Sequence, residues 1–190
     1  YTDPTGMEVE IVFTIEYYEK TDTGYTAFGT LTVTDLDTGE SVTVRAYSGG
    51  RGTDPVDGVS LPIPLGDYDV LEPTKIGYRL EANDYKEGND IVDGTNPEQG
   101  NLRLHGPGSG LSYGCIGVAT KDEWVAVQEI ITSTSTDLSK VDYLKGLLKI
   151  DIIKYGNLTV CLSPELQALN NNEHTKGFIA YKHPSVRTIE

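Results

Sequence analysis

The sequence predicts a mainly β protein that forms a single domain. Apolar and polar residues alternate along three segments of its N-terminal third, Met7–Glu16, Thr30–Leu36 and Ser41–Tyr47. Turn-forming residues separate most of the alternating segments at short intervals. The chain has 190 residues, which suits one domain with its own core, and it contains no repeat or low-complexity tract.

The first strands predict a hairpin and a turn. Asp37-Thr38-Gly39 lies between Thr30–Leu36 and Ser41–Tyr47, so these two strands should pair as a hairpin. Thr21-Asp22-Thr23-Gly24 predicts the turn that ends the first strand.

The middle of the chain predicts loops around two further strands. The glycine-rich residues 48–60 are expected to form a loop, and the rigid turn Pro62–Gly66 leads into a strand over Asp67–Leu71. Ile76–Glu81 predicts another strand. Asn83–Gly100 is rich in turn formers and predicts an exposed loop. Its acidic residues leave calcium binding open as an alternative, although their spacing fits no EF-hand loop.

The clearest helix signal begins at Thr120. Thr120 is a good N-cap and Glu123 completes a capping box, and Trp124, Val127 and Ile131 follow as an apolar stripe. Further elements are predicted along the rest of the chain: a polar linker over Thr132–Ser139, a second short helix through Leu138, Val141, Leu144 and Leu148, strands at Lys149–Tyr155 and Asn157–Leu162, and an edge strand at Gly177–Tyr181 in a polar tail.

Charge excludes two classes of partner. Fifteen basic and 29 acidic residues give a formal net charge of −14, which repels nucleic acid and anionic lipid surfaces. No apolar run reaches the roughly 20 residues of a membrane-spanning helix, so membrane insertion is not expected.

The two cysteines have different predicted roles. Cys161 lies in an apolar strand-like segment and is interpreted as a small buried residue. A disulfide between Cys115 and Cys161 is the plain alternative. Cys115 instead follows a glycine and lies ten residues after His105, and an imidazole is the usual group that activates a thiol.

The segment Asn101–Val118, NLRLHGPGSGLSYGCIGV, therefore predicts a catalytic site. Alternation places Arg103 and His105 on one face of a strand, and a hairpin-like excursion would return the chain so that His105 lies over Cys115. Neither phosphate nor zinc fits, because no Lys-Ser/Thr follows the glycines and no paired ligand spacing exists. His174 and His183 lie in the polar tail and are assigned no role.

Arg-Leu-His-Gly followed by Ser-Xaa-Gly-Cys-Ile resembles the signature of the L,D-transpeptidase (YkuD-like) catalytic domain, a cysteine enzyme that acts on peptidoglycan stem peptides. The upstream Tyr47–Gly50 and Leu61–Tyr68 are similar to the stretch that precedes the family's catalytic strands. The resemblance implies a β-sandwich or barrel-like fold with one or two short helices after the cysteine. It also implies a single catalytic domain over residues 1–190, with a motif core at about 30–162 and a C-terminal extension at 163–190.

The resemblance also implies roles for individual residues. Cys115 is the expected nucleophile, His105 the base, and the Gly106 carbonyl the group that orients the imidazole. The N–H groups of Gly114 and Cys115 are natural oxyanion donors. Other roles have plain alternatives: Ser112 either orients the turn or only forms it, Arg103 binds a substrate carboxylate or makes an ion pair, and Tyr113 donates a hydrogen bond to substrate or, as the safer interpretation, packs.

By the same resemblance the expected reaction removes D-Ala from a tetrapeptide stem through a thioester, as an L,D-carboxypeptidase (hydrolase) or transpeptidase (transferase). No cofactor or metal is expected, and the expected compartment is the periplasm or cell exterior. Tyr113 and Gly117 depart from the common family motif, and the short His–Cys gap looks more like type VI secretion effectors, for which an immunity protein is the expected partner.

Two alternatives remain open on the residues alone. One is a different cysteine amidase or peptidase that uses the same dyad. The other is a non-catalytic β-rich surface binding module in which Cys115 is structural.

Overall fold

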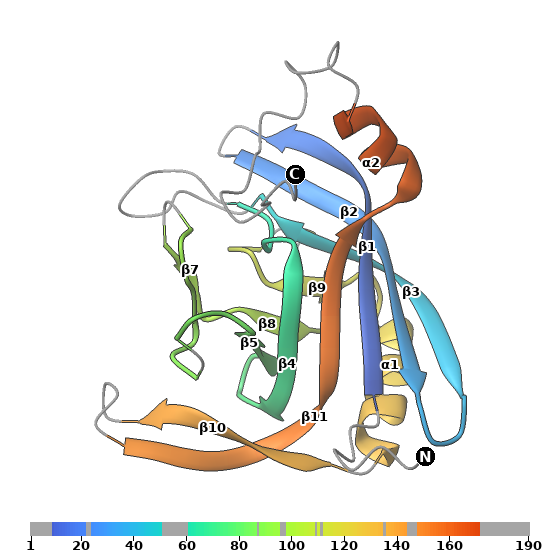
Figure 1. Cartoon of the computed structure of the whole chain (residues 1–190). Coiled ribbons are helices and arrows are strands. Elements are labelled where there is room, and N and C mark those ends of the chain that lie inside the picture. Colours follow the sequence, from blue (N-terminus) through green and yellow to red (C-terminus); the bar gives the residue numbers. More distant parts are fainter. Residues whose placement is uncertain are drawn as a thin grey trace.

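The structure, a computed structural model, is a closed mixed β-barrel with two short helices (Figure 1). It describes residues 9–21, 24–50, 61–86, 88–95, 98–108, 110, 112–134, 136–143 and 148–171. The strands are β1 (Val9–Thr21), β2 (Gly24–Asp35), β3 (Ser41–Gly49), β4 (Gly66–Pro73), β5 (Tyr78–Ala82), β6 (Ile91–Val92), β7 (Gln99–Gly100), β8 (Arg103–His105), β9 (Ile116–Val118), β10 (Asp137–Tyr143) and β11 (Leu148–Leu162).

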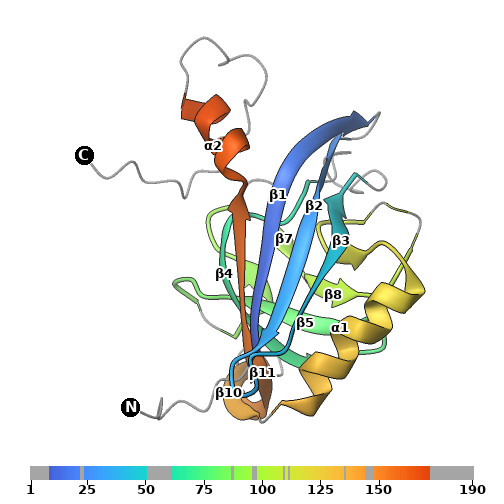
Figure 2. The same ribbon diagram turned by 90° about the vertical axis from the view of Figure 1, so that its right-hand side faces the viewer.

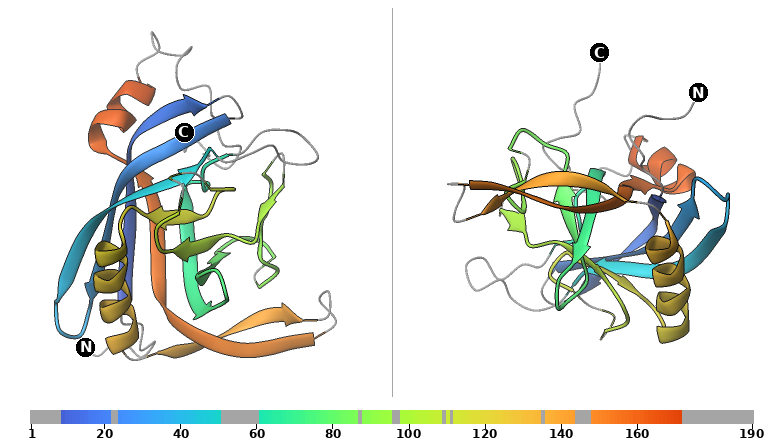
Figure 3. Two further views of the ribbon diagram at one scale, coloured as in Figure 1. Left: turned by 180° about the vertical axis from the view of Figure 1, so that it is seen from behind. Right: turned by 90° about the horizontal axis from the view of Figure 1, so that it is seen from below.

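Eight strands close the barrel in the order β1-β2-β3-β9-β8-β5-β4-β11, because β11 also pairs with β1. The β1–β11 and β8–β9 pairs are parallel, and the others in the barrel wall are antiparallel. Strand β10 lies outside this ring and extends β11 as a hairpin that projects from the barrel (Figure 3). Together with the two helices, this confirms the mainly β, barrel-like prediction.

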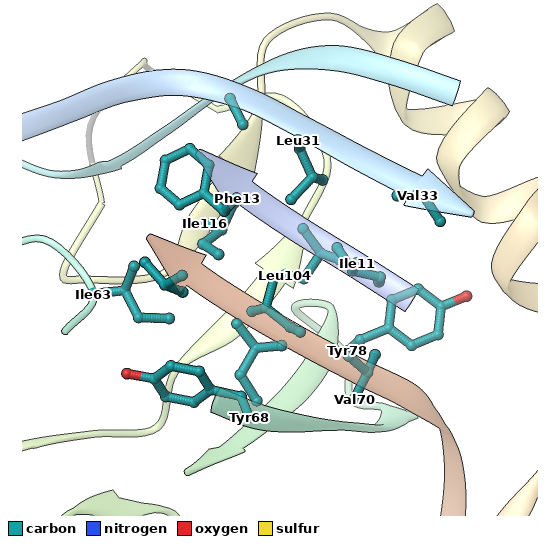
Figure 4. Close-up of a cluster of buried hydrophobic side chains, with 14 of the residues drawn as sticks. Ile11, Phe13, Leu31, Val33, Ile63, Tyr68, Val70, Tyr78, Leu104 and Ile116 are labelled. Atoms are coloured by element: carbon teal, nitrogen blue, oxygen red, sulfur yellow. The ribbon is translucent and has the colours of Figure 1, made fainter. Parts of the chain in front are cut away.

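The barrel interior is a single apolar core. Alternate residues of each strand point inward, and those fully buried include Ile11, Phe13, Leu31, Leu104 and Ile116 (Figure 4). Burial of each such side chain stabilises the fold by about 1.5–3 kcal/mol before entropy is subtracted. Because Leu104 and Ile116 point inward, their neighbours along β8 and β9 point to the outer face.

Helix α1 (Lys121–Ser133) forms where the capping box predicted it. The Thr120 side chain accepts a hydrogen bond from the Glu123 N–H, and the Thr120 hydroxyl donates to the Glu123 carboxylate. Val127 and Ile131 are fully buried, and Trp124 is partly buried against the core. The helix begins shortly after β9 ends and packs beside β2 and β3 (Figure 2).

The predicted β2–β3 hairpin is confirmed, with Val33 paired to Val42. The second helix through Leu138 and Val141 was a wrong prediction, because β10 is a strand there. A helix needs one apolar face at 3.6-residue spacing, whereas Leu138 is 63% exposed and Val141 is buried on the opposite side of a strand.

Other segments also differ from prediction. The two predicted strands Lys149–Tyr155 and Asn157–Leu162 form one strand, β11, with a register shift near Gly156. The polar tail begins with a second helix, α2 (Pro164–Asn171), and Asn83–Gly100 contains the two-stranded β6–β7 sheet. The centre of the Thr21–Gly24 turn, the edge strand Gly177–Tyr181, most of the 48–60 loop, His174 and His183 lie outside the described residues. Within the described residues, no helix is long and apolar enough to cross a membrane.

Candidate active site

His105 and Cys115 lie on the outer face of two neighbouring strands. Strands β8 and β9 are parallel, with Leu104 opposite Ile116 and His105 opposite Gly117. Cys115 precedes β9 by one residue, so this register places it beside Arg103, two residues before His105 on β8, and the alternation of side chains gives all three the same face. Among the described residues, no hydrogen bond joins the imidazole to the thiol.

The connection between these strands is not the predicted hairpin. A hairpin would make β8 and β9 antiparallel, whereas the parallel pair requires the chain to travel back before β9 begins. The ten residues from Gly106 to Cys115 do this by a detour along the end of β3, where Ser112 forms a β-bridge with Gly50. The connection still returns Cys115 to the side of β8, as the sequence predicts, but its path differs from a hairpin.

The His105 ring is held by a backbone carbonyl. Its Nδ1 lies 2.7 Å from the carbonyl oxygen of Gly106, the position that the family resemblance named. A carbonyl oxygen only accepts, so Nδ1 carries the proton and Nε2 of the neutral ring is left with a lone pair. A side chain at Gly106 would not fit, since its Cβ would lie 2.7 Å from Cδ1 of Trp124.

Two glycines near His105 allow close packing that a side chain would block. A Cβ on Gly77, next to β5, would lie 2.8 Å from the Cβ of His105. A Cβ on Gly117 would lie 2.3 Å from Cζ of Tyr47, because the buried Tyr47 ring covers this glycine. The Tyr47 hydroxyl accepts a hydrogen bond from the Gly108 N–H at 3.1 Å, and so ties the connecting loop to β3.

We expect Gly117→Ala to destabilise the protein by about 1–3 kcal/mol, the usual cost of overpacking. The added methyl group would displace the Tyr47 ring from its place against β9. Urea unfolding of the single variants and of the double variant with Tyr47→Ala measures this. The alanine should cost less when Tyr47 is absent, and equal costs in both backgrounds would contradict the proposed clash.

The Cys115 thiol is half-buried and donates a weak hydrogen bond to the Asn101 carbonyl at 3.8 Å. Burial raises the pKa of Cys115, and this effect exceeds the opposing effects of the Arg103 N–H and the Arg103 positive charge. The resting group is therefore a thiol rather than a preformed thiolate, so it needs a base to become a nucleophile.

Ser112 and Gly114 shape the turn that carries Cys115. The Ser112 hydroxyl accepts from the Gly49 N–H at 2.9 Å and donates to the Cys115 carbonyl at 2.6 Å. Gly114 has a φ of 101°, which a residue with a side chain rarely adopts, and its carbonyl accepts from the buried Ser48 hydroxyl at 2.9 Å. Ser112 thus orients the turn through its hydroxyl rather than only occupying it.

Arg103 is buried and forms a two-bond ion pair with Asp90. Its Nη1 and Nη2 atoms each lie 2.8 Å from a different carboxylate oxygen of Asp90. Of the two roles that the sequence left open, the structure displays the ion pair, although the pair is buried and not at the surface. Binding of a substrate carboxylate by Arg103 would require Asp90 to be displaced.

Sequence reasoning missed the charged cluster around this pair. The Glu81 carboxylate, 3% exposed, accepts from the N–H groups of Gly88 and Asp90 and forms an ion pair with Arg79. Arg79 pairs across the strands with Arg103, so the charges of both strands share the outer face. The alternation of Arg79 and Glu81 with apolar residues was the available signal, but nothing in the sequence connected it to Asp90.

The remaining predicted residues are placed as follows. Tyr113 is 60% exposed, so much of its side chain lies at the surface. Cys115 and Cys161 are both free, so the disulfide alternative is not realised. Cys161 is partly buried on β11, with its sulfur 3.8 Å from the Thr14 hydroxyl. Within the described residues, no group of three or more His, Cys, Asp or Glu side chains is arranged to hold a metal ion.

Comparison with known proteins gives no relative. No protein-family model matches the chain, and neither a curated protein nor a solved structure matches it.

Proposed function

We propose that the protein is a cysteine-dependent L,D-transpeptidase or L,D-carboxypeptidase of the periplasm or cell exterior. The observation that carries the proposal is the placement of His105 and Cys115 on one outer face of adjacent parallel strands, with His105 Nδ1 bound to the Gly106 carbonyl. This orientation leaves Nε2 as the nitrogen able to take the thiol proton. The motifs that resemble the L,D-transpeptidase catalytic domain supply the substrate class, a tetrapeptide stem of peptidoglycan.

The proposed reaction has two steps. Nε2 of His105 accepts the proton of the Cys115 thiol while the sulfur attacks the carbonyl carbon of the third stem residue. The tetrahedral intermediate collapses, the bond to D-Ala breaks, and the imidazolium protonates the leaving amine. The thioester is then attacked by water, which gives a tripeptide, or by an amine, which gives a cross-link. The raised pKa of Cys115 agrees with this order of events, in which the proton leaves only during the attack.

The turn before β9 offers oxyanion donors. The positive φ of Gly114 directs the backbone sharply into Cys115. In the part of the chain that the structure describes, the N–H groups of Gly114 and Cys115 have no backbone acceptor. We assign both N–H groups to the oxyanion of the tetrahedral intermediate, and Ser112 to holding them in place through the Cys115 carbonyl.

A carbapenem distinguishes this proposal from a generic cysteine peptidase. The family resemblance implies that the β-lactam carbonyl mimics the stem substrate, so Cys115 should open the ring and retain the whole drug as a thioester. Intact-mass spectrometry should show this adduct on the wild type and on Cys161→Ala, and none on Cys115→Ala. A folded wild-type protein that takes up no carbapenem would favour another amide substrate over a stem peptide.

A further inference from the structure

Asp90 connects to Cys115 by two routes. Its carboxylate binds the Arg103 guanidinium, and its backbone carbonyl accepts from the Asn101 N–H at 2.8 Å. Apart from the N–H of Cys115 itself, the backbone groups that reach the Cys115 sulfur are the Asn101 carbonyl and the Arg103 N–H. One aspartate thus holds both of the residues outside the Cys115 turn whose backbone groups contact the thiol.

The backbone around Asp90 is itself held in an uncommon conformation. Among the described residues, Asp90 and Asn101 are the only ones other than glycine with a positive φ, at 62° and 54°. The two carboxylate oxygens of the buried Glu81 accept from the Asp90 N–H at 3.1 and 3.0 Å and so hold the Asp90 backbone in place. Residues in this region of φ persist when surrounding contacts determine them, and they gather at functional sites.

The charges on this face act on the thiol in opposite directions. Arg103 and His105 lie on β8 beside Cys115, Arg79 and Glu81 lie on β5 beyond them, and Asp90 reaches over from the segment before β6. A thiolate at Cys115 is favoured by the positive charge of Arg103 and disfavoured by the negative charge of Asp90.

We propose that Asp90 is a positioning residue that holds Asn101 and Arg103 against Cys115 and, by neutralising Arg103, adds to the effect of burial in keeping the thiol protonated. The inference deepens the proposed function, since it takes Cys115 to be the nucleophile of that reaction. A protonated resting thiol is protected from oxidation and stray alkylation, because the thiolate is the reactive form.

The test is the pH profile of Cys115 alkylation by iodoacetamide, measured by mass spectrometry in a Cys161→Ala background so that one thiol remains. Asp90→Asn should lower the pH midpoint, because Arg103 then acts on the sulfur without its counter-charge. Each unit of decrease multiplies the thiolate fraction tenfold but reduces its nucleophilicity, so the rate at pH 7 should rise about three- to fourfold. Glu98→Gln is the matched control, since it removes one exposed carboxylate of the same segment and should leave the midpoint unchanged.

A midpoint in Asp90→Asn that equals or exceeds that of the parent protein overturns the proposal. If that variant does not fold by circular dichroism, the double variant Asp90→Asn/Arg103→Gln decides, since it leaves neither of the two charges unpaired. Its midpoint should lie below that of the single variant Arg103→Gln, because the negative charge of Asp90 no longer disfavours the thiolate, and a midpoint equal to or above that of Arg103→Gln overturns the proposal. Alkylation requires no stem peptide, so this outcome is separate from success or failure of the proposed reaction.

Discussion

Cys115→Ala is expected to abolish release of D-Ala from a tetrapeptide stem. Without the sulfur no thioester forms, and loss of a nucleophile typically costs on the order of 10⁴-fold or more in turnover. The alanine removes a half-buried side chain whose weak hydrogen bonds are to backbone groups, so the fold should be retained. Chromatographic measurement of released D-Ala, with circular dichroism on the same samples, checks both statements.

Cys161→Ala is the matched control for this variant. Cys161 is the other free cysteine, lies on β11, and contacts Thr14 rather than any residue of the site. Its replacement should leave the rate of D-Ala release within about twofold. Equal losses in the two cysteine variants would mean that the effect is structural and not chemical.

His105→Gln is expected to lower kcat by about 10²–10⁴-fold, the usual contribution of a general base. Glutamine is polar and similar in reach, but its amide does not accept a proton near neutral pH. The raised pKa of Cys115 makes this loss large, because little thiolate is available without the base. Turnover at several pH values should show that the remaining activity of the variant increases as the solution becomes more alkaline.

His174→Gln serves as the comparison, since this histidine lies in the tail and is assigned no role. Its turnover should match that of the wild type. Loss of less than tenfold in His105→Gln, with His174→Gln unchanged, would remove His105 from the mechanism.

Local patterns predicted the elements whose signals are complete within a few residues. The capping box at Thr120 and Glu123 located the start of α1, and the alternation around Asp37–Gly39 located the β2–β3 hairpin. Both depend on neighbours in sequence, so the sequence contains all of the information that they need.

Elements that depend on distant partners were not predictable in the same way. The spacing of the apolar residues in β10 predicts a helix, and its identity as a strand follows from pairing with β11. The parallel pairing of β8 and β9 likewise depends on β3 and β5, which flank them in the barrel.

In the candidate site, too, the residues with a local motif are predictable from the sequence and those that depend on distant partners are not. His105, Gly106 and Cys115 were identified from a motif within one short segment, and the structure brings His105 and Cys115 to one face. The sequence presents Asp90 only as one acidic residue of a loop, because its partners Glu81 and Arg103 come from two other strands. Charge pairs across strands leave no periodic signal, so only the fold reveals them.

The most direct test of the proposed function is mass spectrometry of purified disaccharide-tetrapeptide after incubation with the wild-type protein and with Cys115→Ala. Loss of one D-Ala, or a new 3-3 cross-linked dimer, is expected with the wild type alone, and the product tells hydrolysis from transfer. An unchanged substrate in the presence of folded wild-type protein, or the same product with Cys115→Ala, would contradict the assignment of this protein as a stem-peptide cysteine enzyme.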